Sequence, residues 1–184
     1  MAASQRRWAA ELLHLWFHQL EPRDWFAPNP RLDALLRRRF SRELRGLHRR
    51  PARDFLTDPA SALAAVLLFD QLPRNLHRGT PLAFATDALA RAITHGALVR
   101  GMDEQLGPQQ RQFLAMPLMH SERIADQRRS LAYFGRLGAR YGAPFARAHY
   151  RMIARFGRFP HRNAVLGRRS SPAESAAIEA GNRW

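Results

Sequence analysis

Residues 58–74, DPASALAAVLLFDQLPR, decide the fold of this chain. Asp58 before Pro59 is typical of a helix N-terminus, because the aspartate can cap free amides and proline suits the first helical position. Between residues 60 and 69 only Ser61 is polar, which predicts a helix buried on nearly all sides. Pro73 should kink or stop this helix and leave carbonyl groups available. The rest of the chain should therefore pack around one central helix.

Further helices are predicted before and after the central helix in the sequence. Apolar residues recur every three or four positions, as in an amphipathic helix, and no segment alternates long enough to form a strand. Trp25 and Phe26 should lie in a loop, whereas Ser171 to Glu174 forms a capping pattern for a short last helix. We therefore predict an all-α fold, a compact helical array in a single domain over residues 1–184. The flanking helices are expected at residues 5–20, 32–47, 84–98, 108–119, 121–137 and 144–156.

The composition limits the classes of protein and of site. The chain has 184 residues, 46% of them hydrophobic and none of them Cys, so cysteine-based sites and disulfides are excluded. Glu11, His14 and His18 interrupt the N-terminal apolar stretch, which argues against a signal peptide. The longest apolar run is about half the length needed to span a bilayer. We expect a cytoplasmic protein without membrane insertion, and the sequence indicates no particular cofactor and no metal site.

Every one of the 30 basic residues is an arginine, and with 15 acidic residues they give a net charge of +15. Arginine binds phosphate through a planar pair of donors, so a nucleic acid, a phosphate compound or an anionic membrane would suit such a chain. A GC-rich genome also favours arginine over lysine, and these arginines are spread along the whole chain. Both explanations stay open.

The first polar cluster follows the apolar run of the central helix. If the helix continues past Pro73, Asp70, Arg74 and Arg78 share one face at four-residue intervals. Charges at the buried end of an apolar helix are costly unless they are paired or contact a ligand. The cluster is therefore either an internal brace or part of an anion site. Its candidate ligand-binding residues are Asp70, Gln71, Arg74, Asn75 and Arg78.

The second cluster lies around His120. On a continuous helix Glu122 and Asp126 would share one face, and His120 and Gln127 another, which does not form a metal-binding stripe. His120 could act as a general acid or base, because the pKa of histidine lies near neutrality. It could equally be a structural histidine with its hydrogen bonds satisfied.

The third cluster occupies residues 155–163. A glycine at 157 and a proline at 160 should turn the backbone, while Phe156 and Phe159 anchor the turn in the core. Arginines beside a histidine and an asparagine suit a phosphate or a carboxylate, although they could also form a C-cap network. The candidates are Arg155, Arg158, His161, Arg162 and Asn163.

Five ordered motifs lie along the chain: FDQLPRN at 69–75, RGT at 78–80, AFA at 83–85, MPLMHSE at 116–122 and RFGRFPHRN at 155–163. Together they resemble a known family, the bacterial domain of unknown function 924. The resemblance covers nearly the whole chain and implies a compact helical fold similar to tetratricopeptide-like domains. It implies no established activity, cofactor or catalytic residue.

Three functions are compatible with these residues. The first is a module that binds a small phosphate- or carboxylate-bearing ligand in an Arg/His/Asn/Asp pocket. The second is a hydrolase or ribonuclease-like enzyme, with His120 or His161 as general acid or base, Glu122 or Asp126 as orienting carboxylate, and arginines stabilising negative charge. The third is an RNA or protein interaction scaffold that uses exposed arginines at 37–39 and 128–129. Helical-repeat-like folds usually bind rather than catalyse, but a fold does not settle function.

Overall fold

The stretch 58–74 forms the central helix of the protein, seen in a computed structural model that describes residues 3–181 and the side chains from Arg7 onward. The Asp58 carboxylate accepts a hydrogen bond of 2.8 Å from the Ser61 amide, which confirms the predicted cap. Every residue from 61 to 73 is buried, as the apolar run predicts. The helix consists of α4 (Pro59–Val66), the π turn η3 (Leu67–Gln71) and α5 (Leu72–Leu76).

Pro73 changes the central helix without ending it. The helix widens into the π turn η3 just before the proline and then continues to Leu76, so of the two predicted outcomes, a kink or a stop, the stop does not occur. Because proline has no N–H, it cannot bond to the carbonyl group of Phe69, four residues earlier. The Thr86 hydroxyl donates to that carbonyl instead, at 2.6 Å. The carbonyl group that lacks its usual partner at Pro73 thus ties the central helix to the start of the next one.

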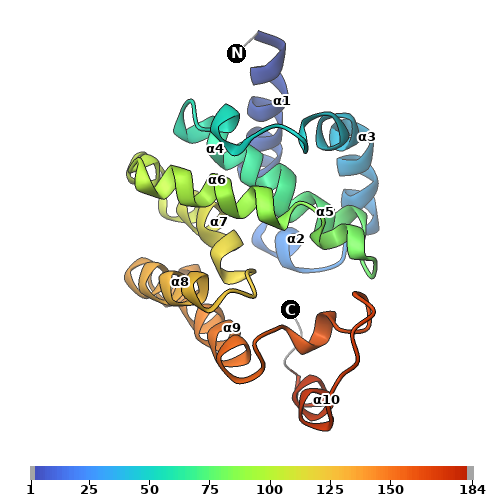
Figure 1. Cartoon of the computed structure of the whole chain (residues 1–184). Helices are drawn as coiled ribbons and strands as arrows, with labels where there is room; N and C mark the ends of the chain where they lie inside the picture. The colour runs from blue at the N-terminus through green and yellow to red at the C-terminus, as the bar shows by residue number, and fades with distance from the viewer. Residues whose placement is uncertain (1–2, 182–184) are drawn as a thin grey trace.

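Four long helices surround the central helix (Figure 1). Their apolar faces meet in one large cluster of buried side chains, in which Trp16, Phe40, Phe69 and Phe113 are among the largest. Residues 22–26 form a short helix, so the loop predicted at Trp25 and Phe26 is wrong. The elements are α1 (Ala3–His14) with its continuation η1 (Leu15–Gln19), α2 (Pro22–Phe26), α3 (Pro30–Leu47), α6 (Asp87–Val99) and α7 (Pro108–Met119).

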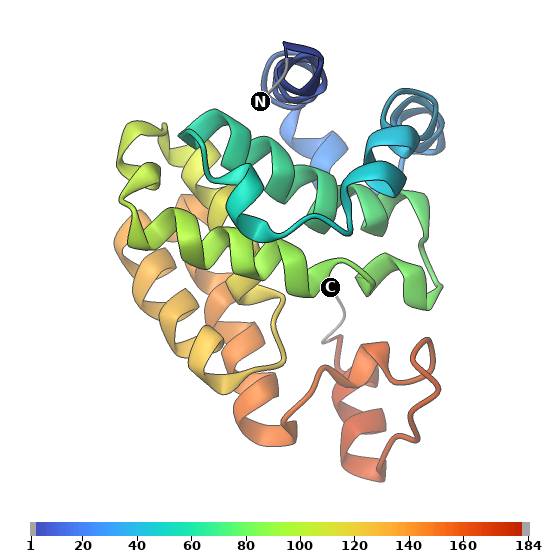
Figure 2. The ribbon, with the colours of Figure 1, turned by 45° about the horizontal axis from the view of Figure 1, so that its top comes forward.

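The second half of the chain continues as α8 (Ile124–Leu137), α9 (Ala143–Phe156) and α10 (Pro172–Glu179). Ser171 caps α10 through the predicted capping box. A second buried cluster lies between α7, α8 and α9, and a third joins α9 to α10 through Met152, Phe159 and Ala177. The segment after α9 turns back beneath α5 (Figure 2). Short 3-10 turns lie at Ala52–Phe55 (η2), Pro81–Phe84 (η4), Met102–Gln105 (η5), Ala139–Tyr141 (η6) and Pro160–Arg162 (η7).

The described residues contain helices, turns and loops and no strand, so the predicted all-α fold is confirmed. Helices that follow one another in the chain pack side by side, as α6, α7, α8 and α9 do, and they form a compact array. Within residues 3–181 every helix is too short or too polar to cross a lipid bilayer.

Candidate functional site

Asp70 is the carboxylate at the centre of the site. It is the fourth residue of the π turn and fully buried. His120 Nδ1 lies 2.8 and 3.0 Å from its two oxygens, Arg74 Nη1 lies 3.3 Å from Oδ1, and the Gln71 amide also donates to it. Burial by itself would raise the pKa of Asp70, but Arg74 and His120 outweigh it and hold the pKa well below its usual range. Asp70 is therefore an ionised carboxylate inside the protein.

Arg74 links Asp70 to a second carboxylate, Asp87, at the start of α6. Its Nη1 and Nη2 donate to the two Asp87 oxygens at 2.8 and 3.0 Å, and Nη1 also donates to the Asp70 carbonyl oxygen at 2.6 Å. Such a two-pronged, charge-assisted contact is among the stronger hydrogen bonds in proteins. Burial would lower the pKa of Arg74, but the two carboxylates raise it. Arg74 is thus charged, with both terminal nitrogens engaged inside the protein.

Three histidines from three parts of the chain lie beside this pair. His120 follows the last residue of α7, His149 lies on α9 and His161 lies in η7. The rings of His120 and His149 are 6.3 Å apart, and the Phe159 ring lies 5.3 Å from His149 and 5.6 Å from His161. Burial lowers the pKa of all three, to about 3 for His149 and about 4 for His161. The histidines are therefore uncharged at neutral pH.

Arg162 reaches the same place from η7. Its guanidinium carbon lies 4.5 Å from the ring centre of Phe159 and 4.7 Å from that of Phe84, so two aromatic side chains hold it. Its nearest carboxylate oxygen, on Asp87, is 3.7 Å away, beyond hydrogen-bond distance. Burial, together with the charge of Arg74, lowers the pKa of Arg162 to about 10. It stays charged at neutral pH in a buried position.

The three predicted polar segments thus meet where α5, the end of α7 and the turn after α9 come together (Figure 2). His120 bonds to Asp70, and Arg162 lies near the Asp87 carboxylate that Arg74 holds. Of the residues predicted for the site, the structure brings together Asp70, Gln71, Arg74, His120, His161 and Arg162.

Glu122 has a bracing position beside the site. Residues 121–123 lie outside a helix and α8 begins only at Ile124, so the predicted common helix face for Glu122 and Asp126 is wrong. The Glu122 carboxylate accepts bonds from both terminal nitrogens of Arg168, at 2.8 and 2.9 Å, and from the Phe159 amide at 2.8 Å. Burial would raise its pKa, but these bonds lower it. Glu122 therefore holds the turn that carries Arg162 rather than orienting a histidine through a direct bond.

Gln127 and Asp126 belong to contacts of α8 with its neighbours. The buried Gln127 amide donates to the carbonyl oxygens of Met119 and Ser121, at 2.7 and 2.6 Å, and so fixes the turn after α7. Asp126 accepts bonds of 2.8 Å from His95 and from the Ser121 hydroxyl. Asp126 therefore orients His95, not His120 or His161 as the enzyme hypothesis requires.

The remaining polar residues of the third cluster hold the C-terminal helix. Arg158 makes a two-pronged contact with Glu174 of α10, at 2.7 and 2.9 Å. The Asn163 amide is fully buried and donates to the same carboxylate and to the Ser170 hydroxyl. Arg155 is exposed and covers the Phe156 ring. The structure therefore separates these three residues from Arg162, although they are neighbours in sequence.

The end of the first cluster braces α5 against α3. Arg78 donates to both oxygens of Asp33, at 3.1 and 3.2 Å, and to the Asn75 side chain. The Asn75 amide lies 3.4 Å from the Gln71 carbonyl oxygen. The common face predicted for Asp70, Arg74 and Arg78 therefore holds only for the first two.

Sequence reasoning missed Asp87, His149 and Phe84. Asp87 has the signal of an acidic residue in the first turn of a helix, which usually indicates capping and dipole effects only. His149 lies on the apolar face of α9, where a histidine gives no separate signal, and Phe84 reads as an ordinary core residue. Their role follows only from the contacts they make in space.

The site contains nitrogen donors and carboxylates, but it has no metal-binding arrangement. Nowhere in the described part of the chain do three or more His, Asp or Glu side chains lie close enough to hold a metal ion together. The chemistry available to this set of residues is hydrogen bonding to an anion and proton transfer through histidine.

Fold and site together define an all-helical protein with a buried cluster of arginines, carboxylates and neutral histidines between its helices. The chain belongs to the family described as bacterial protein of unknown function (DUF924), whose model matches residues 12–182. It is similar to a solved structure of a protein of unknown function from Agrobacterium tumefaciens, ATU0120, with 36% identity and a TM-score of 0.90. That similarity covers 96% of this chain and 99% of the other. A comparison with curated proteins gives no match.

Proposed function

We propose that this protein binds a small anion, a phosphate or carboxylate group, against the guanidinium of Arg162. One observation carries the proposal. Arg162 is only 7% exposed, yet its side chain makes no hydrogen bond to any residue in the described range 3–181, and its Nε is buried without a partner. A guanidinium has five N–H donors, and a buried charge without hydrogen bonds is costly. An anion would supply the missing acceptors.

The surroundings of Arg162 favour an anion over another protein group. Asp87, the nearest carboxylate, is held by two bonds to Arg74 and lies 3.7 Å from Arg162, beyond hydrogen-bond distance. The rings of Phe84 and Phe159 fix the guanidinium plane. A planar, fixed guanidinium matches a carboxylate or phosphate with two parallel N–H···O bonds.

Access to the site is limited but present. The side chains of Arg74, Asp87 and His120 are 21%, 21% and 12% exposed, so solvent reaches the rim while Arg162 lies deeper. Such limited exposure suits a small anionic group better than a polymer backbone.

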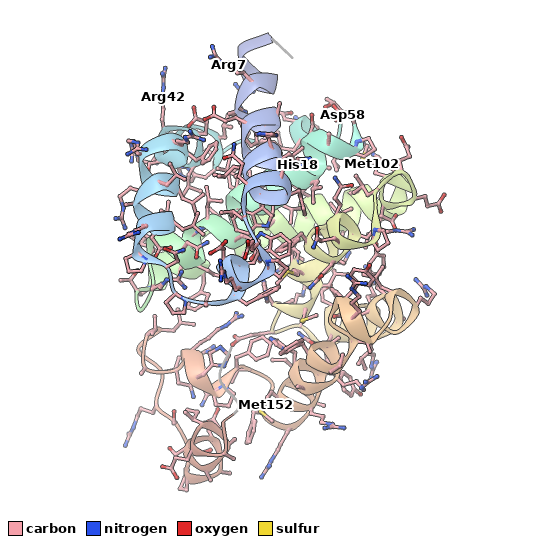
Figure 3. The ribbon with its side chains drawn as sticks, turned by 180° about the vertical axis from the view of Figure 1, so that it is seen from behind. Arg7, His18, Arg42, Asp58, Met102 and Met152 are labelled. Atoms are coloured by element: carbon pink, nitrogen blue, oxygen red, sulfur yellow. The ribbon has the colours of Figure 1, made fainter. Side chains whose placement is uncertain are left out.

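Thermal shift and calorimetry with inorganic phosphate and with acetate, at constant ionic strength, test the proposal. The matched variants are Arg162→Gln and Arg42→Gln, because each removes one positive charge. Arg42 is exposed on α3 and points away from the C-terminal segment (Figure 3). At least one anion should stabilise the wild type and Arg42→Gln, and this stabilisation should vanish in Arg162→Gln. Equal responses in the two variants, or none in the wild type, would refute it.

Arg162→Gln should itself fold, which keeps the test interpretable. Removing one partner of a buried pair is costly when it leaves the other charge uncompensated, but Asp87 keeps both of its bonds to Arg74 when Arg162 is replaced. A lost ligand response can then be assigned to the guanidinium and not to unfolding.

Acid–base catalysis on a bound ester is a second candidate, favoured by the pair formed by Asp70 and His120. Because Asp70 accepts from Nδ1, that nitrogen carries the proton of the neutral ring, and Nε2 is the nitrogen that can take one up. Arg162 would stabilise negative charge developing on the ester. Hydrolysis of p-nitrophenyl phosphate, p-nitrophenyl acetate and RNA should be compared in wild type, His120→Asn and His77→Asn. Any true activity must be lost in His120→Asn and kept in His77→Asn.

A further inference from the structure

A cavity of about 610 Å³ lies away from the Arg162 site. Its lining comes from η1 and α2, from the first turns of α7 and from η6, and it shares no residue with the Arg162 site. His18, at the end of the first helix, is one of the lining residues and is labelled in Figure 3. Nothing in the proposed anion site accounts for this cavity.

One side of the cavity is an aromatic wall. The Phe26 ring lies parallel to the buried Phe113 ring, at an interplanar angle of 7° and 6.3 Å between centres, and it is still 60% exposed. Trp25 packs edge-on against the same ring at 5.2 Å, and its Nε1 donates to the Trp16 carbonyl oxygen at 3.0 Å. These contacts hold the aromatic side chains in place while leaving apolar ring surface in water, which is unfavourable.

The polar part of the cavity is basic and amidic. No Asp or Glu is found among the described residues that line it, whereas Arg140 and His18 do line it. The Arg140 guanidinium carbon lies 5.8 Å from the Tyr141 ring centre, so a neighbouring aromatic side chain supports its position. Gln110 is partly used by the cap of α7, because its side-chain oxygen accepts from the Gly107 amide. The amides of Gln109 and Gln112 also line the cavity.

We infer that this cavity binds an anionic aromatic compound, with its ring against Trp25 and Phe26 and its carboxylate or phosphate near Arg140. The exposed ring surface selects a planar aromatic group, because offset stacking of this kind is favourable and does not depend on the identity of the ring. The absence of lining carboxylates and the presence of Arg140 select a negative charge. A mononucleotide and an aromatic carboxylic acid both carry this chemistry.

Saturation-transfer NMR and calorimetry with adenosine 5′-monophosphate and with benzoate test the inference. Adenosine serves as the ring without the anion. Phe26→Ala should weaken binding of each ligand that binds the wild type about tenfold, as expected for the loss of one stacking contact. Arg140→Gln should weaken the anionic ligands but leave adenosine unchanged, and Arg42→Gln should change nothing.

Both variants alter exposed side chains, so folding should be preserved, and circular dichroism checks this. Binding of the nucleotide alone or of benzoate alone supports the inference and identifies the source of the ligand. If neither compound binds in a saturable manner, or if both Phe26→Ala and Arg140→Gln bind as the wild type does, the inference is overturned. Arg162 does not line this cavity, so Arg162→Gln should bind these ligands here as the wild type does. Failure of this inference can therefore be distinguished from failure of the proposed anion site.

Discussion

The neutral state of His149 makes the stability of this protein depend on pH, with a sign and a size that the structure sets. Burial lowers its pKa from 6.5 to about 3. Between these values the unfolded chain binds a proton at this position and the folded protein does not, so unfolding becomes easier as pH falls. The stability is fully present above pH 6.5 and is lost progressively towards the folded pKa. At about 1.4 kcal/mol per pH unit, His149 alone should cost about 2 kcal/mol at pH 5.

His149→Asn isolates this effect. The His149 ring bonds through Nδ1 to the Phe145 carbonyl oxygen at 2.8 Å, and an asparagine amide can replace that donor without titrating. Urea unfolding of wild type and variant at pH 7 and pH 5 gives the loss of unfolding free energy for each protein. The wild type should lose about 2 kcal/mol more than the variant. His48→Asn is the matched control, because His48 makes the same type of bond, to Arg45, but is exposed.

Other titrating groups do not change the difference in pH dependence between wild type and His149→Asn. The pKa values of Asp70 and Glu122 lie below the ordinary range, so these carboxylates stay ionised in the folded protein down to pH 5. His120 and His161 destabilise in acid with the same sign as His149, but they are present in both proteins. An equal pH dependence in wild type and His149→Asn would refute the argument that His149 is buried in its neutral form.

Three further changes test other parts of the structure by urea unfolding. Asp70→Asn should cost about 3–5 kcal/mol, because it removes the charge of a buried carboxylate that pairs with Arg74 and accepts from His120, and a cost below 1 kcal/mol would contradict the buried ion pair. Gly157→Ala should destabilise the protein by about 1 kcal/mol, because Gly157 has a φ of 69°, which alanine adopts only with strain. Gly135→Ala is the control: Gly135 lies in open space within α8, so alanine should stabilise the helix slightly. Equal effects of the two substitutions would argue against the left-handed turn at Gly157. Thr86→Val should cost about 1 kcal/mol by leaving the Phe69 carbonyl oxygen without its donor, and no change would show that water replaces the hydroxyl.

Much of the fold could be predicted because helix caps and apolar periodicity are local signals. Asp58, Pro59 and the apolar run define the central helix without knowledge of its neighbours, and Ser171 to Glu174 define the last one. The errors occur where local signals compete with packing. Residues 22–26 have a proline and an acidic residue that cap a short helix, and Pro73 is accommodated because a π turn and a hydroxyl group from α6 satisfy the backbone.

The site could be predicted as a set of segments but not as a set of contacts. The sequence marks residues 155–163 as unusual, yet it cannot tell Arg158, which pairs with Glu174, from Arg162, which enters the site. The turn after α9 decides this, since its backbone is held by Arg168 and by Glu122, which lies before α8 in the chain. Orientation of this kind depends on long-range contacts that no local pattern records.

The distribution of hydrogen bonds within this one cluster distinguishes the bracing arginine, Arg74, from Arg162 of the proposed binding site. Two carboxylates, Asp70 and Asp87, face two guanidinium groups, Arg74 and Arg162, so the charges balance in number. The bonds do not balance, because Arg74 takes both Asp87 oxygens and a backbone carbonyl while Arg162 takes none. A purely structural cluster would gain by sharing these acceptors or by replacing Arg162 with an apolar residue. Arg162 is held between two rings and has no hydrogen-bond acceptor within residues 3–181, which supports the proposal that its acceptor comes from a bound anion.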